Sequence, residues 1–285
     1  MAIQAKKEIE INRLSLNKHA VTKDIVAVES PLEISITMLD CKPKIINKNI
    51  SITMRTPEND ANLALGFLFT EGIVSSYADV DKIETQENKI NVFLEADATF
   101  NPDKLERHFY TSSSCGVCGK ASIDAVKTER QIAVENSIFK VDVATILSLP
   151  KKLRAKQAVF ESTGGLHAAA LFSTDGKFIA LKEDVGRHNA LDKLIGASLQ
   201  ENILPLQNHL LLLSGRASFE LIQKAAMAGI QFIIAVGAPS SLAIELAEEF
   251  NITLVGFLKN DGFNIYTGQN RLNLVSKEHK FTNLF

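Results

Sequence analysis

The sequence predicts an α/β protein in which a layered domain of alternating strands and helices follows a smaller, strand-rich α+β part. The N-terminal part favours short strands interrupted by one helix, whereas strands and helices alternate after Val159. This alternation is typical of a sheet with at least three neighbouring parallel strands. The chain has 285 residues, of which 46% are hydrophobic, which is enough for a large core and for two domains.

In the N-terminal part, apolar or alternating runs predict strands at residues 24–28, 32–39, 48–54 and 89–94. One helix is expected between the third and fourth of these strands. Thr56 is its expected N-cap, Pro57 suits its first position, and Gly72 is its expected stop. We place this part at residues 1–112.

In the second part, a helix is expected after Ser122 and another over residues 143–158. Strands 168–173 and 178–182 flank a turn sequence and predict a hairpin. A helix at 190–200 follows, then strands at 209–214, 232–236 and 253–258, with helices at 219–228 and 242–250 between them. We assign residues 113–122 to a mobile loop and residues 123–285 to the α/β domain.

Charge and composition exclude several classes of protein. The net charge is −2, so no basic field indicates nucleic acid or an acidic membrane surface. The apolar stretches are too short to cross a bilayer, and the charged N-terminus is not a secretory signal. Three cysteines do not make a disulfide framework. We therefore expect a cytoplasmic protein that binds neither nucleic acid nor membrane.

Two of the three cysteines, Cys115 and Cys118, lie in one polar stretch that runs from Ser112 to Lys120. The thiolate is the reactive form of cysteine, and the positive charge of Lys120 favours it. Small residues around both cysteines leave their sulfur atoms open to a large partner. This pattern predicts a working sulfur site on a loop.

The Cys-x-x-Cys spacing admits four interpretations. A structural zinc site needs about four ligands, and the sequence has no second pair, so we predict no metal site. A thioredoxin-type pair opens a helix directly after a strand, which the serine run before Cys115 does not favour. A buried, inert pair does not suit the neighbouring glycines and serines. The remaining interpretation is nucleophilic chemistry, in which Cys115 or Cys118 accepts a sulfur atom and passes it on.

Polar residues follow three successive strands where helices are expected to begin, in segments 183–189, 214–218 and 237–241. Ligands bind α/β sheets at such strand-to-helix turns, and helix N-termini and arginines bind phosphates. We therefore expect a phosphate-bearing ligand in one crevice. Its expected contacts are Arg187, His188, Ser214, Gly215 and Arg216.

Other residues add to this site or leave alternatives. His167 enters a strand after a glycine pair, and His188 or Asn189 is expected to cap the next helix. A segment in which aromatic residues alternate with lysine, asparagine and glycine suits a nucleotide base, although a plain loop before a terminal strand has the same composition. It comprises Phe257, Leu258, Lys259, Asn260, Asp261 and Gly262. Neither a P-loop nor a Gly-x-Gly-x-x-Gly motif is present.

Together these segments resemble the formate dehydrogenase accessory sulfurtransferases, the FdhD family. Five blocks occur in family order between about residues 113 and 266: Ser-Ser-Cys-Gly-Val-Cys-Gly at 113–119, Thr-Gly-Gly-Leu-His-Ala at 163–168, Glu-Asp-Val-Gly-Arg-His-Asn-Ala with Asp192 and Lys193 at 183–193, Ser-Gly-Arg with Ser218 at 214–218, and Phe-Asn with Tyr266 at 263–266. Each block alone is weak, but five in order are specific.

The resemblance implies a sulfur carrier with a cytidine-deaminase-like larger domain, similar to known homodimers. In that family a cysteine desulfurase loads a persulfide onto the cysteine that corresponds to Cys115. The sulfur then passes to the molybdenum cofactor, in its bis(guanine dinucleotide) form, before insertion into formate dehydrogenase. The family's cofactor-binding stretch corresponds to residues 257–262. Deaminase chemistry is not expected, because Ala169 stands where the deaminases carry the glutamate of His-x-Glu, and both cysteines precede His167.

Two other functions remain open at this point: a cofactor-binding chaperone without sulfur chemistry, and a thiol-disulfide oxidoreductase. The sequence does not decide whether Cys118 resolves or relays the persulfide. Glu183, His167 and His188 suit a cofactor contact, a proton-orienting role or a structural role equally. We interpret Cys41 as a structural thiol without a role in the reaction.

Overall fold

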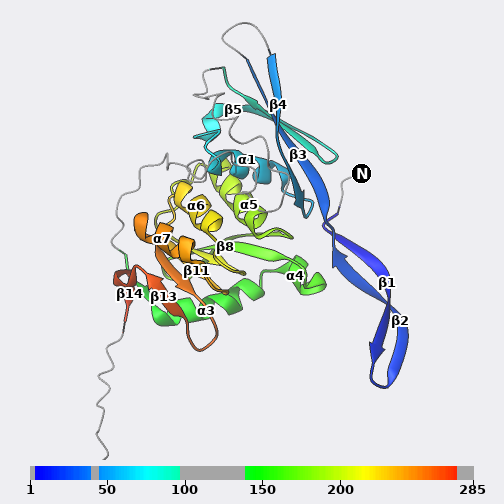
Figure 1. Ribbon diagram of the computed structural model, residues 1–285, viewed down its shortest axis with the longest axis vertical. Coiled ribbons are helices and arrows are strands. Elements are labelled where there is room, and N and C mark those ends of the chain that lie inside the picture. The colour runs from blue at the N-terminus through cyan, green and yellow to red at the C-terminus, as the bar shows by residue number, and fades with distance from the viewer. Residues whose placement is uncertain (1–3, 40–44, 97–138, 275–285) are drawn as a thin grey trace, which may run out of the picture.

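The computed structural model describes residues 4–39, 45–96 and 139–274. The predicted loop 113–122 with both of its cysteines, Cys41 and the helix expected after Ser122 lie outside the described residues, so the domain boundaries stay predictions. The described chain forms stacked layers: a four-stranded sheet, a layer of helices, a six-stranded sheet, and one further helix below it (Figure 1).

The six-stranded sheet has the order β13-β12-β11-β10-β8-β9. Its strands are β8 (His167–Ser173), β9 (Phe178–Asp184), β10 (His209–Leu213), β11 (Phe232–Ala235), β12 (Thr253–Gly256) and β13 (Asn264–Thr267). β10, β11 and β12 are parallel neighbours, as predicted, whereas β8 and β13 run antiparallel to them. Helices α5 (Arg187–Gln200), α6 (Phe219–Met227) and α7 (Ser241–Glu249) cover one face, and α3 (Val143–Arg154) covers the other.

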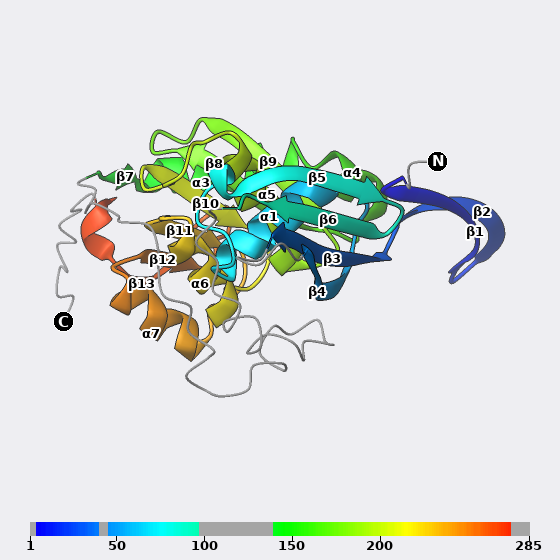
Figure 2. The same ribbon diagram turned by 90° about the horizontal axis from the view of Figure 1, so that it is seen from above.

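The N-terminal part contains a second sheet and an isolated ribbon. The sheet has the order β4-β3-β6-β5 and is built from β3 (Ser30–Leu39), β4 (Ile45–Arg55), β5 (Val80–Gln86) and β6 (Lys89–Leu94), with η1 (Tyr77–Asp79) before β5. Helix α1 (Asp60–Thr70) lies between this sheet and α5. The ribbon, β1 (Lys6–Ser15) and β2 (Lys18–Ala27), projects from the body (Figure 2). Short elements β7 (Val141–Asp142), η3 (Gln269–Arg271) and β14 (Leu272–Asn273) complete the chain.

The inner strands of the six-stranded sheet are buried on both faces, which explains the uninterrupted leucine run of β10. Successive side chains of a strand point to opposite faces. Leu211 and Leu213 therefore join the core beneath α5, α6 and the four-stranded sheet, whereas Leu210 and Leu212 join the core around α3. The first core is continuous from the N-terminal sheet to α7. The predicted layered α/β class with a strand-rich N-terminal part is confirmed.

The predicted start of the first helix is wrong. Helix α1 begins at Asp60 with Asn59 as its N-cap, so Thr56 and Pro57 lie before it. Thr56 is unavailable because it is bound elsewhere: its backbone N–H donates to Asp184 Oδ2 over 3.1 Å, and its hydroxyl oxygen accepts from the Val185 N–H over 3.1 Å. The predicted stop is correct, since Gly72 follows the helix with a positive φ of 72°.

The helix expected over residues 143–158 ends four residues early, because α3 stops at Arg154 and a separate helix, α4 (Ala158–Thr163), begins at the last expected residue. The break has a tertiary cause. Glu183, from β9, accepts hydrogen bonds from the Val159 and Phe160 N–H groups over 3.2 and 3.0 Å and so stabilises a new helix start. The sequence also gave no expectation of β1 or β5, because most residues of both strands are exposed and form no continuous apolar run.

Candidate functional site

The predicted site residues gather at one edge of the six-stranded sheet. Because β8 is antiparallel to both β9 and β10, strands β9, β10, β11 and β12 all end at this edge, and β8 begins there. This geometry brings His167, at the start of β8, next to the turn after β10, where a Cβ atom added at Gly215 would lie 3.2 Å from His167 Nδ1. The turns after β9, β11 and β12 lie along the same edge.

Backbone hydrogen bonds join these turns into one rigid rim. The Gly237 N–H donates to the Gly215 carbonyl over 2.9 Å, and the Phe257 N–H donates to the Gly237 carbonyl over 3.1 Å. Ser214 is fixed from both sides, since its N–H donates to the Ala168 carbonyl and its hydroxyl accepts from the Ala168 N–H over 2.8 Å. Only glycine fits at position 237, because a Cβ atom would lie 2.9 Å from the backbone nitrogen of the preceding turn's Arg216.

Part of the polar block 183–193 is structural. Asp184 is fully buried and pairs with Lys193, with 2.7 Å between Oδ2 and Nζ. It also accepts hydrogen bonds from the Gly186 N–H and the Asn189 amide, over 2.8 and 3.1 Å. Lys193 in turn donates to the Thr56 carbonyl. Asp184, Asn189 and Lys193 therefore fix the β9–α5 turn to the segment before α1 and are not free for a ligand.

The predicted caps of α5 are also wrong. Gly186 is its N-cap, and both His188 and Asn189 lie inside the first turn. Asn189 is committed to Asp184, while His188 turns to α6, where its Nε2 lies 2.8 Å from Glu220 Oε2 and 3.2 Å from Ser218 Oγ. Burial raises the pKa of Glu220, but the hydrogen bond and charge of His188, together with the charges of Lys224 and Arg187, outweigh it and lower that pKa overall. An ionised Glu220 thus fixes the orientation of His188 at the rim.

Arg187 and Arg216 bring positive charge to the same rim. Arg187 opens α5, and its Nε is buried without a hydrogen-bond partner among the described residues. Arg216 is exposed in the turn after β10. Burial, Arg187, His188 and Arg216 all lower the pKa of half-buried His167 below its ordinary 6.5, and only Asp184 acts in the opposite direction. His167 is therefore expected to be neutral at pH 7 in a positively charged surrounding.

This lowered pKa predicts a pH-dependent stability. Because the folded state lowers the pKa of His167, the unfolded chain binds more protons at this residue in the pH range just below 6.5. The free energy of unfolding therefore falls as the pH drops through 6.5, and it stops falling below the folded-state pKa. His167→Gln should show a shallower loss between pH 7 and 5 than the wild type, measured as urea midpoints. The control His19→Gln, on the exposed ribbon, should keep the wild-type slope. Equal slopes for wild type and His167→Gln would contradict the assignment.

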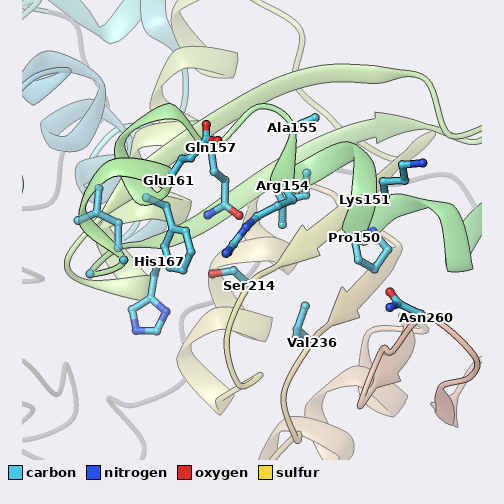
Figure 3. A pocket seen from close by; sticks show the side chains of 15 residues that line it. Pro150, Lys151, Arg154, Ala155, Gln157, Glu161, His167, Ser214, Val236 and Asn260 are labelled. Atoms are coloured by element: carbon cyan, nitrogen blue, oxygen red, sulfur yellow. The ribbon is translucent and has the colours of Figure 1, made fainter. Parts of the chain in front are cut away.

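A cleft of about 1020 Å³ opens beside this rim (Figure 3). The sheet edge contributes His167, Ser214 and Val236, and the loop after β12 contributes Asn260. Its other wall is formed by α3, α4 and the turn between them; the lining residues there are Pro150, Lys151, Leu153, Arg154, Ala155, Gln157, Phe160, Glu161, Gly164, Gly165 and Leu166. A cleft of this size accommodates a nucleotide-sized ligand.

The α3–α4 wall is the part that the sequence did not predict. Lys151, Arg154 and Gln157 carry polar groups to the cleft from a segment that reads as an ordinary amphipathic helix. The one feature of the sequence that could have indicated this wall is its positive charge. Four of the six residues from 151 to 156 are cationic: Lys151, Lys152, Arg154 and Lys156. That run is equally typical of a solvated helix face, and only the fold brings it opposite His167.

The predicted base-binding segment 257–262 lies after β12, and only some of its residues are placed to contact a ligand. Phe257 is 43% exposed, with a positive φ of 53°, and Asn260 lines the cleft. Leu258 is only 2% exposed and belongs to the core around α3, so its side chain anchors the segment and does not face a ligand. The Lys259 N–H donates to the Gly262 carbonyl over 2.9 Å and closes the loop, leaving Lys259 and Asp261 exposed.

Within residues 4–39, 45–96 and 139–274, no three His, Cys, Asp or Glu side chains lie close enough together to hold a metal ion. In the same ranges, no helix has the length and apolar character needed to span a membrane.

Three known proteins that this chain is similar to carry the name of one family. The profile of the FdhD/NarQ family matches residues 27–273. A protein named "Sulfur carrier protein FdhD" from Mycolicibacterium paratuberculosis is 44% identical over 280 residues, covering 95% of this chain and 100% of its own. Proteins of the same name from Streptomyces coelicolor and Sulfolobus acidocaldarius are 46% and 42% identical, covering 88% and 94% of this chain and 90% and 99% of theirs.

A solved structure agrees in fold. The crystal structure of a candidate formate dehydrogenase accessory protein from Desulfotalea psychrophila aligns with a TM-score of 0.68 at 20% identity, covering 94% of this chain and 99% of that one. The family profile covers almost all of the described chain, and the relatives match over nearly their full length. The chain with this rim and cleft belongs to the FdhD/NarQ family.

Proposed function

We propose that this chain is a sulfur carrier. It accepts a persulfide sulfur from a cysteine desulfurase on Cys115 and transfers it to a molybdenum cofactor, in its bis(guanine dinucleotide) form, before that cofactor enters formate dehydrogenase. The observation that carries the proposal is the cleft at the rim, which combines a nucleotide-sized volume with cationic side chains. The names of the relatives, which cover the chain almost completely, support the sulfur-carrying part.

The first chemical step is a thiolate exchange without net oxidation. The Cys115 thiolate attacks the outer sulfur of the donor's persulfide, a new S–S bond forms, and the donor's own cysteine leaves as a thiolate. An exposed cysteine with small neighbours suits this step, because it must reach a second protein. The product is a Cys115 persulfide.

The second step requires two electrons if the sulfur reaches the metal as sulfide. We assign these electrons to Cys118. Its thiolate attacks the Sγ atom of Cys115, a Cys115–Cys118 disulfide forms, and hydrosulfide leaves toward the cofactor. A cellular thiol then reduces the disulfide and restores both cysteines.

The rim residues have a binding role in this scheme. Arg187, Arg216 and the starts of α5 and α6 present positive charge and N–H groups, which favour the phosphates of the cofactor as substrate. Phe257 and Asn260 offer an exposed ring and an amide for a base. The persulfide chemistry belongs to the cytoplasm, where thiols are kept reduced. We also propose that the protein acts as a homodimer, like the proteins it resembles.

Intact-protein mass spectrometry tests the sulfur-loading step. After incubation with a cysteine desulfurase and cysteine, the wild type should gain the mass of one sulfur atom, and Cys115→Ala should gain none. Cys118→Ala should still gain one, because Cys118 acts only in release. A protein that never gains sulfur would contradict the carrier function and favour a cofactor-binding chaperone. Efficient reduction of insulin disulfides by the wild type would instead favour an oxidoreductase.

A further inference from the structure

The guanidinium of Arg154, on the α3–α4 wall, forms no hydrogen bond or ion pair with the residues that the structure describes. Its side chain stacks on the Phe160 ring, with Cζ 4.4 Å from the ring centroid. Within the described part of the chain, the guanidinium has no ion pair or hydrogen bond, although Glu161 lines the same cleft. Stacking fixes the side chain without using its five N–H donors. The cleft therefore contains a positioned cation whose donors are free.

Gln157, next to Arg154 along the chain, carries a second unengaged group. It is only 5% exposed, yet its side-chain amide makes no hydrogen bond to any residue that the structure describes. The amide is not among the described buried groups that lack a partner, so it reaches the open space of the cleft. In Figure 3 the side chains of Arg154 and Gln157 both point into the cleft toward Ser214. A largely buried glutamine whose amide faces a cleft offers a ligand a positioned donor and acceptor.

The opposite side of the cleft adds compatible groups. The Ser214 oxygen accepts from the Ala168 N–H over 2.8 Å, so its own hydroxyl hydrogen is left to donate. His167 lies beside it, and Lys151 adds a second positive charge on the α3 wall. Several donors and the Arg154 cation thus face one space, and Lys151 adds positive charge at its margin. A group with several acceptor oxygens and negative charge fits them, and a diphosphate supplies both.

We propose that Arg154 and Gln157 form a subsite that binds the diphosphate of a nucleotide ligand, opposite Ser214. The proposal rests on the proposed function for the identity of the nucleotide, and it adds the last residue of α3 and the N-cap of α4 to the binding surface. In this arrangement the α3–α4 wall binds a diphosphate in addition to the phosphate contacts of the rim arginines. The loop after β12 binds the base.

Calorimetric titration with inorganic pyrophosphate, GDP and guanosine tests the subsite. Arg154→Met and Gln157→Glu should each weaken pyrophosphate and GDP binding by about 10- to 100-fold, because each loses or repels a charge-assisted contact. Guanosine binding should stay unchanged. The matched controls are Arg13→Met on the ribbon and Gln86→Glu at the end of β5, both exposed and remote from the cleft. Both controls should bind all three ligands like the wild type.

Three outcomes would overturn the subsite: no pyrophosphate binding by the wild type, unchanged binding by Arg154→Met, or an equal loss for GDP and guanosine. Arg154 is exposed, so its variant tests the proposal even if Gln157→Glu fails to fold. Sulfur loading separates this test from the proposed function. If Arg154→Met loses pyrophosphate while no variant of the chain ever gains sulfur, the subsite stands and the carrier function fails. The reverse result contradicts the subsite alone.

Discussion

Replacing Cys115 with alanine is expected to abolish formate dehydrogenase activity in cells while the protein still folds. The chain would be expressed in a bacterium that lacks its own homologue, and formate oxidation would be measured in extracts. The wild type should restore activity, because it loads and delivers sulfur. Cys115→Ala should restore none, since alanine provides no thiolate to accept the donor's sulfur. Comparable amounts of soluble protein in both strains would exclude a folding defect.

The other two cysteines serve as comparisons in the same assay. Cys41→Ala should restore activity fully, because we assign that thiol no role. Cys118→Ala should load sulfur and yet fail to restore activity, because release requires its electrons. Normal activity with Cys115→Ala would contradict the carrier function, and activity in a variant that lacks both Cys115 and Cys118 would favour the chaperone.

Alanine at Gly66 or Gly196 is expected to destabilise the protein severely. Helices α1 and α5 touch backbone to backbone at these glycines. A Cβ atom at Gly66 would lie 1.9 Å from the Asp192 carbonyl oxygen, and one at Gly196 would lie 1.9 Å from the Asn62 carbonyl oxygen. Both neighbours are helix backbone, so the helices themselves must move apart. Since α1 and α5 connect the two sheets through one core, the displacement would open that core.

The expected loss is at least about 3 kcal/mol, the upper range for overpacked cores, against a total stability of about 5–15 kcal/mol. Helix propensity alone predicts the opposite sign, a gain of about 1 kcal/mol for glycine to alanine. Urea midpoints of the variants therefore distinguish the two effects. Gly262→Ala is the control, because nothing lies within 4 Å of its Cβ position and its φ is not positive. Unchanged or increased midpoints for Gly66→Ala and Gly196→Ala would contradict the packing.

The periodicity of the sequence predicted β10, β11 and β12 well, because these inner strands are buried on both faces and give continuous apolar runs. It failed where a distant residue decides a local structure. Thr56 is drawn away from its capping role by Asp184, and the break between α3 and α4 depends on Glu183. A local pattern carries no information on contacts across more than twenty residues. In the exposed ribbon only the end of β2 was predicted, as part of the strand 24–28, because β1 and most of β2 bury too little to show a pattern.

The candidate site was predictable in outline only. Polar turns after successive strands placed Arg187, Ser214 and Arg216 at one sheet edge. The structure brings them together there with His167, which was predicted separately at the start of a strand. The sequence did not separate ligand-facing from structural members of the block 183–193. Burial makes that separation, because Asp184 is enclosed with Lys193 while Arg187 remains at the rim. The position of the α3–α4 wall opposite the sheet edge could be seen only in the folded structure.

The most direct test of the sulfur-carrier function follows labelled sulfur from cysteine to the cofactor. Cysteine carrying radioactive sulfur is given to the desulfurase and this chain, the loaded chain is separated, and the molybdenum cofactor is added in a single turnover. We predict that the label first resides on Cys115 and then moves to the cofactor, leaving the chain unlabelled. Label that never reaches the chain, or that stays on it after the cofactor is added, would contradict the function as a sulfur carrier.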